Sequence, residues 1–245
     1  MSNYNVGRIC LWGAFSMLMA SCSSSYQIQG NSSITTLDGK MLFLKRLQPD
    51  GWHSVDSTEV VHGLFTMEGA VDSVRMVTLY MDDEGIMPLI LENGKIEVSI
   101  SNSQLLAKGT PLNDALYEFI DKRNSMEMRM EELERKEARM VLDGADLDET
   151  RVRLSKEADA LRREMDDYVK KFISDNYETV LGPNVFLMMC ATLPYPMMTP
   201  IIEDIVKAAP ASFTTHPLVS DFLQKARENM QLMEEHRRLT SSPRQ

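Results

Sequence analysis

The chain has 245 residues and a formal net charge of −10, with 36 acidic residues against 26 lysines and arginines. A surface with this excess of negative charge repels phosphate groups, so nucleic acid is excluded as an expected partner. The length is sufficient for one large or two small hydrophobic cores.

Residues 1–21 predict a secretory signal peptide. One positive residue, Arg8, precedes an apolar run over residues 9–19, and small residues follow that run. The run is about half as long as a membrane-spanning helix requires, which favours a signal peptide over a permanent span. Removing the segment takes away Arg8 and no acidic residue, so the net charge would change from −10 to −11.

Cys22 is the predicted lipidation site. Residues 19–22, Met-Ala-Ser-Cys, resemble the lipobox of bacterial lipoproteins, in which the cysteine receives acyl chains such as palmitate and begins the mature protein. The chain would then be attached to a membrane by its lipid. An ordinary cysteine near a signal cleavage site is the alternative. Residues 22–25 predict a short flexible tether. Because Ser23 is not Asp, the resemblance to lipoprotein sorting rules favours the outer membrane, with the protein facing the periplasm.

Residues 26–110 predict a β-rich domain. Short runs of alternating apolar residues recur between turn residues, which is typical of an antiparallel β-sandwich or a barrel-like sheet. Asn93-Gly94 predicts a type I′ turn that would join two of these strands in a hairpin. The expected strands are residues 26–29, 41–47, 52–60, 64–68, 75–81, 87–91, 95–101 and 104–108.

Five motifs in this half resemble, in their order, a domain of unknown function of the DUF4369 type. They are YQIQG at 26–30, VDST at 55–58, GLFTMEG at 63–69, LENGKI at 91–96 and GTPLN at 109–113. In that family the domain commonly precedes a thioredoxin-like domain in exported Bacteroidetes lipoproteins named thiol-disulfide interchange proteins. The resemblance covers about residues 26–123, and a looser one continues to about residue 230. A Trp-Cys-x-x-Cys motif is absent from the sequence, so the redox chemistry of those proteins is not expected here.

Residues 111–240 predict a helical region, which makes the expected fold class α+β. Apolar residues recur at steps of three and four over residues 112–142 and 148–176, separated by an Asp/Gly turn. This pattern predicts a long antiparallel helical hairpin with coiled-coil packing, each arm reaching roughly 40 Å and projecting beyond the sheet domain. Prolines separate three shorter expected helices, and a disordered tail follows. These helices are residues 184–193, 199–209 and 218–239, and the tail is residues 241–245.

No catalytic, cofactor or metal site is expected. The four histidines lie far apart in sequence without the spacing of metal ligands, at His53, His62, His216 and His236. Methionine pairs at residues 188–189 and 197–198 flank Cys190 and are a conceivable copper(I) site, but core filling explains them better. The acidic clusters at residues 82–84 and 131–132 fit turns and solvated faces better than calcium ligands or acid–base pairs.

Cys190 is expected to be a buried, unreactive thiol. It lies in an apolar run and has no cationic neighbour in sequence that would stabilise a thiolate. Cys10 would leave with the signal peptide and Cys22 would be acylated. An internal disulfide or a Cys-x-x-Cys exchange pair is therefore not expected.

Three functions are compatible with these features. The favoured one is an exported, membrane-anchored lipoprotein that acts as a non-enzymatic accessory or interaction module and binds an envelope protein through its helical arms. One alternative is a stand-alone accessory lobe of a thiol–disulfide interchange system, acting beside a thioredoxin-like protein. Another is a lipoprotein that binds a small molecule or a sugar. A fold by itself does not choose among them.

Overall fold

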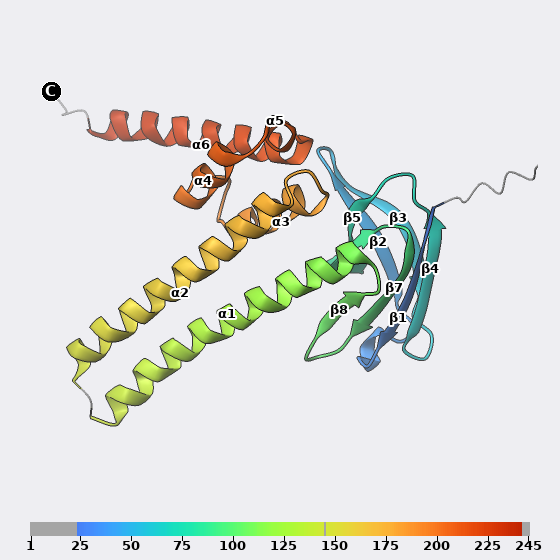
Figure 1. Ribbon diagram of the computed structural model, residues 1–245, viewed down its shortest axis with the longest axis horizontal. Coiled ribbons are helices and arrows are strands. Elements are labelled where there is room, and N and C mark those ends of the chain that lie inside the picture. The colour runs from blue at the N-terminus through green and yellow to red at the C-terminus, as the bar shows by residue number, and fades with distance from the viewer. Residues whose placement is uncertain (1–23, 145, 242–245) are drawn as a thin grey trace, which may run out of the picture.

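The computed structural model describes residues 24–144 and 146–241, and it shows two β-sheets followed by helices (Figure 1). The sheets have the strand orders β4-β1-β7-β8 and β3-β2-β5-β6, and they are not closed into a barrel. The expected α+β class is confirmed, with a sandwich as the β-rich part. The predicted signal peptide and Cys22 lie outside the described residues.

The eight expected strands are all present; residues 75–81 form a strand with the expected ends, and the others are shifted at one or both ends. Apolar side chains alternate along them, so that one face of each sheet packs into the space between the sheets. A short 3-10 helix, Thr35–Leu37, follows the first strand. The strands are β1 (Ser25–Ser32), β2 (Met41–Gln48), β3 (Gly51–Glu59), β4 (Leu64–Ala70), β5 (Arg75–Met81), β6 (Glu84–Leu91), β7 (Gly94–Ile100) and β8 (Leu105–Lys108).

The predicted hairpin at Asn93-Gly94 is wrong. β6 belongs to one sheet and β7 to the other, so this turn carries the chain across the sandwich. A type I′ turn needs positive φ at both central residues, but only Gly94 has it, at 127°. Residues 89–92 are all buried, which shows that the end of β6 is covered on both faces. Tertiary burial therefore overrides the local turn preference.

Strand β7 lies between β1 and β8, and it runs parallel to β1 and antiparallel to β8. Tyr26 lies opposite Gly94, and Ser32 lies opposite Ile100. The sheet is consequently mixed, where an entirely antiparallel arrangement was expected. The Asn93 side chain supports this pairing, because its Oδ1 accepts a hydrogen bond from the Ser25 N–H at 2.9 Å.

The flexible tether is predicted to extend to Ser25, but Ser24 and Ser25 already pair with the chain at the end of β4. The Ser24 carbonyl accepts a hydrogen bond from the Val71 N–H at 2.8 Å, and β1 already begins at Ser25. Backbone groups that pair with neighbouring strands are held in place by the sheet. Ser24 and Ser25 therefore pair with the sheet and do not belong to a flexible tether.

The described part of the chain contains six α-helices. They are α1 (Pro111–Leu142), α2 (Leu147–Asp175), α3 (Leu181–Cys190), α4 (Pro200–Ala208), α5 (Ala211–Thr214) and α6 (Pro217–Ser241). The sequence did not predict α5, because a single turn shows no apolar periodicity. Helix α3 starts earlier than expected and includes Pro183, which a first helical turn tolerates. Helix α6 reaches one residue into the expected tail, and residues 242–245 lie outside the described residues.

The expected hairpin of α1 and α2 is confirmed and reaches away from the sandwich (Figure 1). Ion pairs join Arg129 to Glu164 at 3.0 Å and Lys136 to Glu157 at 3.2 Å. Seven residues forward on α1 thus correspond to seven residues back on α2, so the two helices run antiparallel. Leu161 is buried in the seam between the helices.

Helix α1 is fixed to the sandwich at its first turn, through a set of contacts that we call the α1 joint (Ile90, Glu92 and Asn113). Glu92 Oε1 accepts hydrogen bonds from the backbone N–H of Leu112 at 2.8 Å and of Asn113 at 3.2 Å. A carboxylate here pairs with amides that have no partner within the helix, and it opposes the positive end of the helix dipole.

The Asn113 side chain completes the joint and is fully buried. Its Oδ1 accepts a hydrogen bond from the Ile90 N–H at 2.9 Å, and its Nδ2 donates to the Ile90 carbonyl at 2.8 Å. The same amide donates to the Thr110 hydroxyl at 2.9 Å. The amide of Asn113 thus replaces the backbone partner that another strand would have supplied to β6.

The joint predicts that Asn113→Ala destabilises the protein by about 3 kcal/mol, because it leaves the N–H and the carbonyl of Ile90 buried without partners. Urea unfolding measures this loss. Asn31→Ala is the matched control, because the exposed Asn31 bonds only to the Ser99 hydroxyl, and it should cost less than about 1 kcal/mol. Equal losses in the two variants would contradict the role of the joint.

Candidate functional site

Cys190 ends α3 and is buried, with 5% of its surface exposed. Burial raises the pKa of its thiol to about 12. The thiol is therefore protonated at neutral pH, and a thiol in that state is a poor nucleophile. This agrees with the unreactive thiol that the sequence predicts. Cys22, the predicted lipidation site, lies outside the described residues.

The structure does not bring the four histidines together. His53 contacts Asp50 at 3.0 Å, and this hydrogen bond lowers the pKa of the Asp50 carboxyl. His62 lies in a turn with φ of 53°, His216 precedes α6, and His236 lies on the exposed C-terminal part of α6. In residues 24–144 and 146–241, no group of three or more His, Cys, Asp or Glu side chains is placed to hold a metal ion.

The methionines near Cys190 also diverge. Met188 lines a groove between α3 and strands β5 and β6, whereas Met189 lines a different groove on the side of α2 and α4. Met198 packs against the hydrophobic core. This arrangement fits side chains that fill space between helices, because a thioether metal site requires the sulfur atoms to converge.

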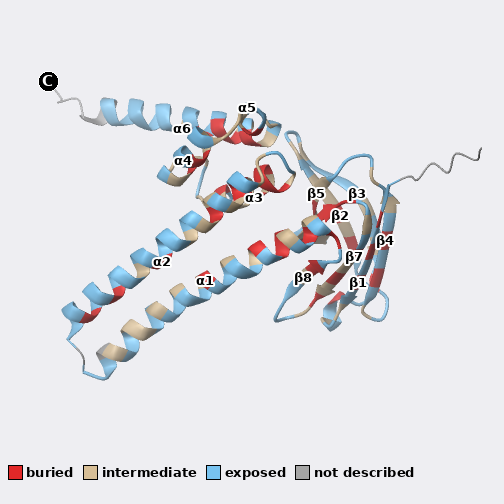
Figure 2. Cartoon of the chain, in the orientation of Figure 1, coloured by how far each residue is buried: buried red, intermediate tan, exposed pale blue. Residues whose placement is uncertain are grey.

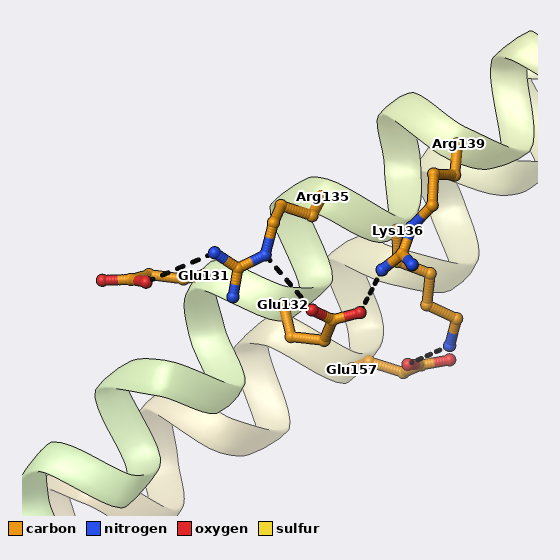
Figure 3. A network of polar contacts seen from close by, with 6 residues as sticks. All are labelled: Glu131, Glu132, Arg135, Lys136, Arg139 and Glu157. Atoms are coloured by element: carbon orange, nitrogen blue, oxygen red, sulfur yellow. Dashed lines mark hydrogen bonds and ion pairs between the residues drawn. The ribbon is translucent and has the colours of Figure 1, made fainter.

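The far part of the α1–α2 hairpin, residues 128–144 and 146–164, carries a network of charged side chains (Figure 3), and we call this part the arm. Arg135 pairs with Glu131 at 3.7 Å and with Glu132 at 3.2 Å, and Arg139 also contacts Glu132. The hydrogen bond from Arg135, with the charge of Arg139, lowers the pKa of the Glu132 carboxyl. These acids therefore belong to a solvated charged face, as expected, and such exposed pairs contribute little to stability.

The arm also exposes apolar side chains. Met128 on α1 is 60% exposed and Val152 on α2 is 58% exposed. Figure 2 shows that exposed and intermediate residues make up most of the end of the hairpin far from the sandwich, while the buried residues of α1 lie toward its base. Two helices can cover only one stripe of each other, so the remaining faces of the arm stay open to solvent or to a partner.

A groove of about 330 Å³ lies at the base of the arm, between α1, α2, α3 and α4. Its walls are largely apolar, with Phe119, Val185 and Ile202 among them, and we call it the basal groove. The ion pair of Arg123 with Glu127, at 2.9 Å, lies at the groove. An apolar cavity with few polar groups is the usual form of a small-molecule site.

Two polar side chains of the basal groove, Asp166 and Thr199, lie in unusual environments. Burial, followed by the neighbouring charge of Asp167, raises the pKa of the Asp166 carboxyl. The Thr199 hydroxyl oxygen is buried and has no hydrogen-bond partner among the described residues. The sequence did not point to either residue, because the groove is assembled from four helices and no local motif marks it.

The comparisons with known proteins concern the sandwich. Residues 26–116 match the profile of a family described as Domain of unknown function (DUF4369). The match confirms the resemblance for the domain itself, and it includes the α1 joint but not the arm. Neither a curated protein nor a solved structure matches the chain. Among the described helices, none combines the length and the apolar composition needed to cross a bilayer.

The environment of Cys190 predicts slow alkylation by iodoacetamide in the folded protein, because its thiolate is scarce and its sulfur is covered. In a background with Cys10→Ser and Cys22→Ser, we expect labelling at least about a hundredfold slower than that of a cysteine introduced by Val152→Cys. Mass spectrometry follows both rates. In urea the two rates should converge, and rapid labelling of native Cys190 would contradict the buried environment.

Proposed function

Residues 26–116 form a DUF4369 domain, and we propose that the chain carrying it is an exported, lipid-anchored accessory protein of the cell envelope. It binds a partner protein through the arm and catalyses no reaction itself. The observation that supports this proposal is the arm, because it extends well past the part of the hairpin that packs against the sandwich and the other helices.

The dimensions of α1 support a binding role. Its 32 residues correspond to about 48 Å at 1.5 Å per residue. After Met126, no described side chain of α1 is buried. Ordering this segment costs conformational entropy, and the segment buries little apolar surface that would offset the cost. Met128 on α1 and Val152 on α2 are exposed apolar side chains of the arm, and packing against a partner's apolar side chains would offset that cost.

The arrangement of the sandwich supports an anchor at Cys22. Helix α1 contacts β8 at one edge of its sheet, whereas β4 and β1 lie toward the other edge. Figure 1 shows the arm leaving the sandwich on the side away from β1 and β4. An anchor that precedes β1 would therefore leave the arm directed away from the membrane, into the periplasm if the outer membrane is the site of attachment.

A small-molecule ligand is the second candidate function. The basal groove favours it, because a volume of about 330 Å³ with mainly apolar walls falls in the range of ligand pockets. The unpartnered Thr199 hydroxyl would give such a ligand one specific hydrogen bond.

Photo-crosslinking in intact cells tests the arm. We expect p-benzoylphenylalanine at Met128 or Val152 to form a discrete protein adduct, because both positions lie on the proposed binding surface. The same residue at Leu64, which is 62% exposed on the sandwich, is the control and should give none. Adducts that are absent from the arm, or equally abundant at Leu64, would contradict the proposal. A thioredoxin-like protein as the captured partner would assign the chain to thiol–disulfide interchange.

Acyl labelling tests the anchor. Cys22→Ala should abolish incorporation of radiolabelled palmitate and move the protein from the membrane fraction to the soluble fraction, because a lipid chain is the proposed means of attachment. Cys190→Ala is the matched control and should leave both properties unchanged. Membrane fractionation of Cys22→Ala in the wild-type proportion would refute the anchor.

A further inference from the structure

Another cleft, of about 340 Å³, lies between one end of the sandwich and the start of α6. We call it the sandwich–α6 cleft. Arg46 and Arg75 line it from β2 and β5, Asn184 lines it from α3, and His216 lines it directly before α6. Figure 1 shows the beginning of α6 beside the turn that joins β2 to β3.

Two polar atoms of this cleft are buried without partners. They are the Arg75 Nε and the His216 Nδ1, and in the described chain only the Thr199 hydroxyl shares this property. Arginine can only donate hydrogen bonds, so only an acceptor can satisfy Arg75. The neutral histidine ring donates from one of its nitrogens, and Nδ1 can take that role. Arg75 therefore requires a ligand with an acceptor oxygen, and His216 can donate to the same ligand in the tautomer that carries its proton on Nδ1.

The charge of the cleft is positive in a protein of net charge −10. None of the described residues that line it is acidic. No described carboxylate lies within 4.0 Å of the guanidinium of Arg46 or Arg75, whereas Arg129 on the arm pairs with Glu164 at 3.0 Å. Two arginines that face one cleft without an acidic partner repel each other, and an anion between them removes that repulsion.

Several described carboxylates lie near this end of the sandwich, but none lines the cleft. Asp50 and Asp72 adjoin the lining residues Pro49 and Ser73 in sequence, and Asp50 pairs with His53 at 3.0 Å. Asp56 accepts a hydrogen bond from the Tyr26 hydroxyl at 2.7 Å, and burial with this bond raises the pKa of Tyr26 while the charge of Arg75 opposes the rise. Asp56 is thus bound to Tyr26, does not line the cleft, and forms no ion pair with Arg75. It offsets part of the positive charge but does not occupy the donors.

The beginning of α6 adds to the positive potential in the cleft. Pro217 and Leu218, its first two residues, line the cleft. The N-terminus of a helix of 25 residues carries a partial positive charge and amides without helical partners, which favour a bound anion. The remaining walls include apolar side chains, Val74 and Met76 among them.

We propose that the sandwich–α6 cleft binds a small organic oxyanion, a carboxylate or a phosphate group carried on an apolar body. Arg46 and Arg75 hold the oxyanion, His216 donates to it, and the apolar walls take the body of the ligand. The site is separate from the arm and does not depend on the proposed partner protein.

Equilibrium dialysis of the full chain with hexanoate, hexyl phosphate and hexanol tests the site. One of the two anions should bind saturably at one per chain, and hexanol should bind far more weakly because it lacks the charge. The better anion identifies the source as a carboxylate or a phosphate. The absence of saturable binding by both anions at millimolar concentration would overturn the proposal.

The double variant Arg46→Gln, Arg75→Gln should weaken anion binding by about tenfold or more, since it removes two charge-assisted contacts. Arg227→Gln is the matched control, because it makes the same change on the exposed face of α6 and should bind as wild type does. Equal affinity in the double variant and in the control would overturn the assignment.

A variant that should become more stable tests the site without the risk that lost binding only reflects misfolding. Val74 is 46% exposed and lines the cleft, so Val74→Glu would place a carboxylate within reach of the arginines. We expect Val74→Glu to have a higher melting temperature than Val74→Gln and to exclude hexanoate. A lower melting temperature together with retained anion binding would contradict the proposal.

Discussion

The arrangement of the helices depends on the hydrogen bonds that attach the first turn of α1 to the sandwich. A helix that starts against a buried strand brings amide groups without helical partners into contact with a core, and each must be satisfied. Glu92 and Asn113 do this from opposite sides, since one caps the helix and the other pairs with Ile90 of β6. A strand edge and a helix end thereby satisfy each other, and the direction in which α1 leaves the sandwich is set at this point.

The direction of α1 also decides where the arm, the basal groove and the sandwich–α6 cleft lie. Because α2 returns antiparallel to α1, α3 arrives beside strands β5 and β6, and α4 closes the basal groove against α2. Phe186 of α3 then packs edge-on against Phe213 and Phe222, with ring centroids 5.6 Å apart in both pairs. These contacts hold α5 and α6 so that α6 begins over Arg46 and Arg75. The arm and the sandwich–α6 cleft are both consequences of one anchored helix.

The helices contribute the surfaces that distinguish this chain from a bare sandwich. The DUF4369 match ends at residue 116, whereas the arm, the basal groove and the α6 side of the cleft come from later residues. A fold shared across a family does not define a function, which resides in the groups that a particular chain presents. The proposed roles therefore rest on exposed apolar side chains of the arm and on unpartnered donors of the cleft.

The kinds of element and their order follow from the amino-acid pattern alone, because apolar residues recur every two residues in a half-buried strand and about every three and a half residues in a half-buried helix. Local preference failed where burial decided otherwise. The turn at Asn93-Gly94 crosses between sheets because the end of β6 is covered on both faces, and α5 is too short to show a period. Only the tertiary structure brought Glu92 to the first turn of α1 and Arg46 and Arg75 to α6, since contacts between segments that far apart in the chain leave no local pattern.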